Sequence, residues 1–161
     1  MYKLSKKFEI RGKILMNNDI IETLVSYGNI DWTHISFAGH LSEEFIRKYQ
    51  DKLDWEYISS NQKLSEAFIE EFQDKIDWQS ISANQILSEK FIRKYQDKLD
   101  WEYISSHQKL SEAFIEEFQD KINWFYISLN QKLSEAFTEV PTGLSPVVSL
   151  KIEEEIKHRT M

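Results

Sequence analysis

The stretch LSEEFIRKYQDKLDWEYISSNQ, residues 41–62, decides the fold, because the chain repeats it several times. Close copies begin at Leu64, Leu87 and Leu110, and a further copy starts at Leu133. The tryptophans keep the same register and stand 23 residues apart, at Trp32, Trp55, Trp78, Trp101 and Trp124. A fixed period of this length is typical of an array of stacked structural repeats.

Within one unit, local signals predict two helices. Ser42 and Asp54 are good N-caps, because their side-chain oxygens can accept hydrogen bonds from free N–H groups of a first helical turn. After Ser42 the apolar residues follow one stripe of a 3.6-residue period, at Phe45, Ile46, Tyr49 and Leu53. We expect a helix of about three turns, a tight corner, and a helix of about two turns followed by a left-handed Asn61.

Neither helix can bury its apolar stripe alone, so the stripe must pack against apolar residues of neighbouring units. The sequence therefore predicts an all-α fold, a solenoid of stacked helix-turn-helix repeats of 23 residues. We expect a single domain over residues 1–161, with the repeat array at residues 29–137.

The two ends of the chain depart from the repeat, as units that cover the ends of a stack do. Residues 1–28 are expected to form a divergent N-terminal cap, with a short hairpin or a helical segment near its start and a helix over residues 19–27. Pro141 breaks the last copy, and residues 138–161 are expected to form a cap with a C-terminal capping helix.

A longer period of 46 residues lies over the first. Residues 41–86 and 87–132 differ at only seven positions, so the natural unit is a doublet. Its two halves differ in charge, because Arg47-Lys48 and Arg93-Lys94 stand where the alternate units carry two glutamates. Equivalent positions of stacked helices lie about one helix diameter apart, so we expect the alternating charges to attract and to fix the register.

Composition excludes several kinds of site and partner. The chain has no cysteine, so it holds no disulfide, no thiolate nucleophile and no cysteine-ligated metal. Its net charge is −7, and an acidic array is a poor binder of phosphate backbones, so we expect no direct nucleic-acid binding. We see no signal peptide and no apolar run near the roughly 18 residues of a membrane span, and we expect a soluble, cytoplasmic protein without a membrane partner.

We expect no catalytic, cofactor-binding or metal-binding site. The glycine-rich and nucleophile motifs of common enzymes are absent from the sequence, and the histidines lack metal-ligand spacing. Asp54, Asp77 and Asp100 are explained as caps, and the equivalent Asn123 could not serve as a general base. The protein is therefore expected to be a non-enzyme.

Three further residue types recur once per unit. We expect the recurring serines to bond to backbone near the end of the short helix and the recurring glutamines to bridge units. The tryptophans keep a fixed place in an apolar pattern with Ile and Phe, which favours a packed core over an aromatic cage.

Variation between the copies points to the surface, because repeats hold core positions fixed. The most variable positions are the two residues after each tryptophan and the residue after the repeated serine, all on the short helices. Several are aromatic, and aromatic anchors are typical of protein interfaces. The predicted partner-binding residues are Glu56, Tyr57, Ser60, Gln79, Ser80, Glu102, Tyr103, Phe125, Tyr126 and Leu129.

The pattern LSxxFIxxYQDKLDWxxIS resembles the short tryptophan-containing repeats found in proteins of giant DNA viruses, bacteriophages and some bacteria. The resemblance covers residues 30–137. It implies a viral or mobile-element origin and an interaction role, and it implies no catalytic residues.

Three functional hypotheses follow. The first is a protein–protein interaction module, which the resemblance extends to a viral or phage protein that binds and inhibits a host defence factor. The second is an acidic mimic of nucleic acid that occupies the basic cleft of a nuclease, through Glu70, Glu71, Glu116 and Glu117. The third is a self-associating structural protein that forms a homodimer.

Overall fold

The computed structural model describes residues 18–28, 30–38, 40–134 and 137, and all ten elements in them are α-helices. The predicted all-α repeat fold is confirmed. The helices are α1 (Asn18–Ser26), α2 (Trp32–Ala38), α3 (Glu43–Lys48), α4 (Trp55–Asn61), α5 (Glu66–Glu71), α6 (Trp78–Asn84), α7 (Glu89–Lys94), α8 (Trp101–His107), α9 (Glu112–Glu117) and α10 (Trp124–Asn130).

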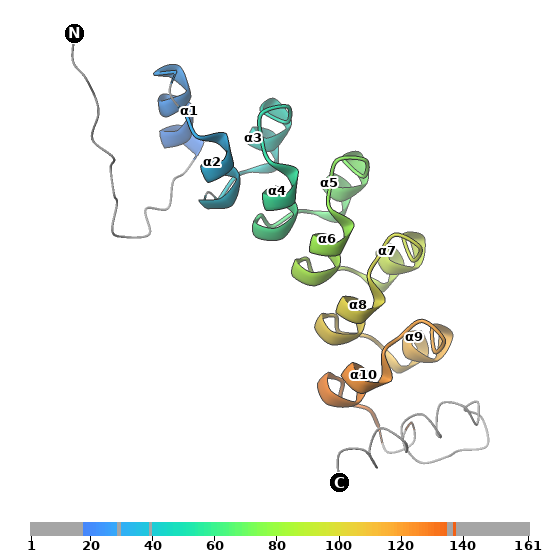
Figure 1. Ribbon diagram of the computed structural model, residues 1–161. Coiled ribbons are helices and arrows are strands. Elements are labelled where there is room, and N and C mark those ends of the chain that lie inside the picture. The colour runs from blue at the N-terminus through green and yellow to red at the C-terminus, as the bar shows by residue number, and fades with distance from the viewer. Residues whose placement is uncertain (1–17, 29, 39, 135–136, 138–161) are drawn as a thin grey trace.

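The helices form two rows along an arc (Figure 1). The odd-numbered helices make up the outer row, and the even-numbered helices lie along the inner side of the arc. The most extensive helix–helix contacts are all between consecutive even-numbered helices. We call the exposed side chains of α2, α4, α6, α8 and α10, together with their N-cap residues, the inner face.

The predicted caps are confirmed, but the first helix of each unit is shorter than expected. The Ser42 hydroxyl accepts from the Phe45 N–H, and the Asp54 carboxylate accepts from two N–H groups of α4. Helix α3 has six residues, not about three turns. It ends early because the Gln50 carbonyl accepts from the Trp55 indole at 2.9 Å, while Lys52 N–H bonds to the Tyr49 carbonyl in a tighter turn.

The prediction of a left-handed Asn61 is wrong. Asn61 is the last residue of α4, and among the described residues no residue other than glycine has a positive φ. Gln62 follows in extended conformation, with φ −93° and ψ 148°. An extended exit turns the Gln62 side chain into the interior, where it is 3% exposed.

One apolar core runs through all the units. The isoleucines of the short helices, such as Ile58, are fully buried against phenylalanines and isoleucines of the outer row. The first four tryptophans pack on aromatic rings of the next unit. For Trp55 the ring centroid lies 5.0 Å from that of Phe72 and 6.3 Å from that of Phe68. The predicted core role of the tryptophans is confirmed.

Buried glutamines bridge the units, as predicted. Gln85 accepts from the Leu64 N–H of its own unit at 3.1 Å. Its amide donates to two carbonyls of the preceding unit, Ser59 at 3.1 Å and Gln62 at 2.7 Å. These groups would otherwise be unpaired and buried, so one side chain satisfies three backbone positions. Gln62, Gln108 and Gln131 bridge units in a similar way, each accepting from one backbone N–H and donating to one carbonyl of the preceding unit.

The recurring serines form a second set of bridges. The Ser59 hydroxyl donates to the Trp55 carbonyl at 2.7 Å, as the sequence predicted, and also accepts from the Asp77 N–H of the next unit at 2.9 Å. Each serine therefore fixes the entry of the following short helix. The equivalent residues with both bonds are Ser36, Ser82 and Ser105.

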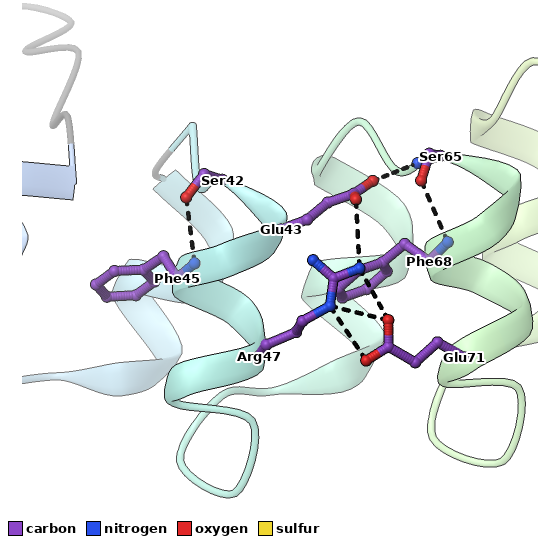
Figure 2. A network of polar contacts seen from close by, with 7 residues as sticks. All are labelled: Ser42, Glu43, Phe45, Arg47, Ser65, Phe68 and Glu71. Atoms are coloured by element: carbon purple, nitrogen blue, oxygen red, sulfur yellow. Dashed lines mark hydrogen bonds and ion pairs between the residues drawn. The ribbon is translucent and has the colours of Figure 1, made fainter.

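Along the outer row, charged side chains pair between units (Figure 2). Glu43 of α3 accepts from the Ser65 N–H at 2.7 Å, and Arg47 reaches Glu71 at 2.8 Å. The predicted alternation of charge is confirmed by ion pairs with the same offset of 24 residues, Arg93–Glu117 and Lys94–Glu70. All these side chains are substantially exposed, so we assign the pairs to register rather than to stability.

The two ends can be compared with prediction only in part. The helix expected over residues 19–27 is confirmed as α1. The hairpin or helical segment near the start and the C-terminal capping helix lie outside the described residues.

If the glutamine bridges stabilise the array, replacing a bridging glutamine by an apolar residue of the same volume should lower the free energy of unfolding. Replacing Gln85 by Met keeps the volume but leaves three buried backbone groups unpaired. We expect the free energy of unfolding to fall by about 3 kcal/mol, measured by urea denaturation. The matched control Gln79→Met, at an exposed glutamine of the same unit, should change it by less than about 0.5 kcal/mol. Equal effects would show that the bridge contributes nothing specific.

Candidate functional site

All ten predicted partner-binding residues lie on short helices and belong to the inner face. The residue after each tryptophan is exposed in α4, α6, α8 and α10, and the following one is half-buried. This placement results from the helical period, because the tryptophan and the isoleucine three residues later both turn toward the core. The sequence therefore predicted correctly that these residues share one face of the array.

The aromatic residues do not form one continuous row. Helix α6 carries Gln79, Ser80 and Ala83 at the three variable positions, and it separates the aromatic residues of α4 from those of α8 and α10. The inner face thus has two aromatic clusters. One lies where α2 meets α4, and the other lies where α8 meets α10.

The cluster at α8 and α10 holds the most exposed apolar residues among the predicted ones. Phe125 is 42% exposed and Leu129 is 46% exposed, although Ile127 between them is fully buried. The rings of Phe125 and Tyr126 pack edge to face, with centroids 5.4 Å apart. Two large apolar side chains are therefore held at the surface of a helix whose opposite side is buried.

A carboxylate from the neighbouring unit orients this cluster. The Tyr126 hydroxyl donates to Glu102 Oε1 at 3.2 Å. This hydrogen bond and the negative charge of Glu102 raise the pKa of Tyr126 above its ordinary value of 10.0. The contact joins α8 to α10 across the inner face.

The cluster at α2 and α4 includes residues outside the predicted set. The rings of Phe37 and Tyr57 meet edge to face, with centroids 5.6 Å apart, and Phe37 is 56% exposed. They border a shallow pocket of about 290 Å³ that is also lined by Asp31, Thr33 and His34. Phe37 occupies the same repeat position as Leu129, so the variability that identified Leu129 also identifies Phe37.

The four glutamates of the nucleic-acid mimic hypothesis lie on the outer row instead. Glu70, Glu71 and Glu117 are each within 2.9 Å of an Arg or Lys. For Glu116 the residue 24 positions further along is Val140, so the sequence offers it no equivalent cation. Most of this negative charge is therefore neutralised.

The inner face holds a different set of carboxylates. No short helix contains Lys or Arg. Within the described part of the chain, the inner-face carboxylates have no ion-pair partner, and most cap helices or accept from Tyr126 instead. They are Asp31, Asp54, Glu56, Asp77, Asp100 and Glu102.

No metal or membrane feature emerges from the described residues. Nowhere among them do three His, Asp or Glu side chains gather to hold a metal ion. None of the described helices is long and apolar enough to cross a membrane.

The contact between Tyr126 and Glu102 can be tested by titration. In a Glu102→Gln variant the charge is lost, so we expect the pKa of Tyr126 to fall toward its ordinary value. The measurement is an NMR pH titration of the Tyr126 ring. Glu56→Gln, the same change at the equivalent position of α4, should leave that pKa unmoved. A Tyr126 pKa that is identical in both variants would contradict the contact.

No protein-family model, no curated protein and no solved structure matches this chain. The viral resemblance therefore stays a prediction, and the residues of the inner face carry the functional argument.

Proposed function

We propose that this protein is a non-enzymatic interaction module that binds another protein through its inner face. The observation that carries the proposal is the coincidence of variability and exposure. Positions that change between near-identical copies gather on one face, and they place exposed Phe125 and Leu129 beside half-buried tyrosines. Exposed aromatic and apolar anchors are what protein interfaces use.

The shape and rigidity of the array support the same function. The short helices line the inner side of an arc (Figure 1), and such concave surfaces are the usual binding surfaces of repeat proteins. Serine and glutamine bridges hold each short helix to the next, so the anchors are preorganised. A preorganised surface loses less conformational entropy when it binds.

The alternative hypotheses have less support. The nucleic-acid mimic needs free carboxylates on the outer row, and three of its four glutamates are in ion pairs. Self-association would place a second copy on the inner face, and sedimentation analysis of the purified chain measures it directly. That the partner is a host defence factor rests on the resemblance alone and is part of the proposal.

The proposal predicts that changing three inner-face residues abolishes binding without unfolding the array. The variant is Phe125→Ser, Tyr126→Ser and Leu129→Ser. Ligands selected from a displayed library of random 15-residue peptides against the native chain should lose at least about 100-fold in affinity, because anchor residues carry most binding energy. Binding is measured by fluorescence anisotropy.

The matched control replaces three exposed outer-row residues, Ala67, Lys90 and Ala113, by Ser. It should bind the selected peptides as the native chain does. Circular dichroism should show the same helix content in all three proteins. Selected peptides that bind the triple inner-face variant with native affinity would refute the proposal.

A further inference from the structure

We propose that the inner face takes a basic segment of its partner, with one Lys or Arg side chain seated in the pocket between Phe37 and Tyr57. This inference rests on the proposed function and gives the partner its chemistry. Three observations carry it: the distribution of charge between the two rows, the composition of the pocket, and the distance between the two aromatic clusters.

Charge is segregated between the two rows of helices. On the outer row the Arg and Lys side chains pair with glutamates of neighbouring units. The inner face carries six carboxylates and no cation on its helices. Lysines flank the short helices at both ends: Lys63, Lys109 and Lys132 follow their C-terminal ends, and Lys52, Lys75, Lys98 and Lys121 stand two residues before their N-caps. The ammonium groups of the last four lie over the tryptophan rings of the preceding short helices, 5.2 Å from the ring centroid for Lys52 and Trp32. The short helices themselves, together with their N-caps, therefore carry a net negative charge.

The pocket at α2 and α4 combines the two groups that bind organic cations. Asp31 supplies a carboxylate: one oxygen accepts from the His34 N–H at 3.1 Å, and no described residue bonds to the other. Phe37 and Tyr57 supply aromatic rings, which attract ammonium and guanidinium groups through their faces. A volume of about 290 Å³ suits one side chain rather than a larger ligand.

The second aromatic cluster repeats this chemistry at a distance that one extended peptide can span. At α8 and α10 the Glu102 carboxylate lies beside Tyr126. Three units separate α10 from α4, or about 30 Å at one helix diameter per unit. An extended chain rises about 3.3 Å per residue, so cations about nine residues apart reach both clusters.

The test uses a fluorescein-labelled 12-residue peptide with Arg at positions 2 and 11, Leu at positions 3 and 10, and Gly or Ser elsewhere. A second peptide carries citrulline in place of both arginines, which keeps the shape and removes the charge. We expect the arginine peptide to bind the native chain at least about fivefold more tightly than the citrulline peptide, measured by anisotropy at low salt. Binding of the arginine peptide at the pocket should shift the NMR amide signals of Thr33, His34 and Phe37.

A variant that neutralises three inner-face carboxylates tests whether they cause the preference for the arginine peptide. Asp31→Asn, Glu56→Gln and Glu102→Gln together should weaken the arginine peptide at least about fivefold and leave the citrulline peptide unchanged. The cap at α2 survives this change, since Asn123 caps α10 in the same way. The control Glu44→Gln, Asp74→Asn and Glu116→Gln changes net charge equally away from the inner face and should bind as the native chain does.

The outcomes separate the two proposals. If both peptides bind equally and both are lost in the Phe125, Tyr126 and Leu129 variant, the face binds proteins but not through charge, and this inference is overturned. If neither peptide responds to any inner-face change, this inference is overturned, whereas the proposed function falls only if the selected peptides also bind the Phe125, Tyr126 and Leu129 variant with native affinity. Should the neutralised variant unfold, the native chain still decides: affinity for the arginine peptide that does not weaken between 50 and 500 mM salt overturns the inference.

Discussion

The array depends on satisfying the backbone where one unit joins the next. At each joint the chain leaves a short helix, crosses the interior and starts another helix, so N–H and C=O groups are buried without a helical partner. A buried amide and a buried hydroxyl per unit meet that need, and each bonds to groups of two consecutive units. Since unpaired buried groups are costly, this polar scaffold holds the units in one relative placement.

Because the scaffold and the core occupy most positions of the unit, few positions are left free for function. The caps, the glutamine, the serine, the tryptophan and the isoleucines are repeated in nearly every copy. Of the seven positions that differ between residues 41–86 and 87–132, five lie on the short helices or at their N-caps. Substitutions on the inner face can therefore change its binding properties and leave the serine and glutamine bridges between units intact. Nearly identical units can in this way present different side chains.

The repeat architecture, the caps and the inner face could be predicted from the sequence, because each rests on local periodicity. The helix ends could not. The early end of α3 depends on the Trp55 indole taking the Gln50 carbonyl, a contact visible only once the corner is folded. Asparagine tolerates the left-handed conformation, which is why it was predicted at Asn61. The structure instead continues from α4 into an extended Gln62, whose side chain is buried. The pocket at Asp31 was missed because two elements from different units build it.

The ion pairs of the outer row restrict how the array can change in length. The glutamine and serine bridges follow the 23-residue period, so they would tolerate loss or gain of a single unit. The charges would not: without residues 64–86, Arg47 would face Lys94 in place of Glu71, and attraction would become repulsion. Removal or duplication of 46 residues restores opposite charges at every step. The array is therefore built to evolve by whole doublets, and its two near-identical halves are what such a duplication leaves.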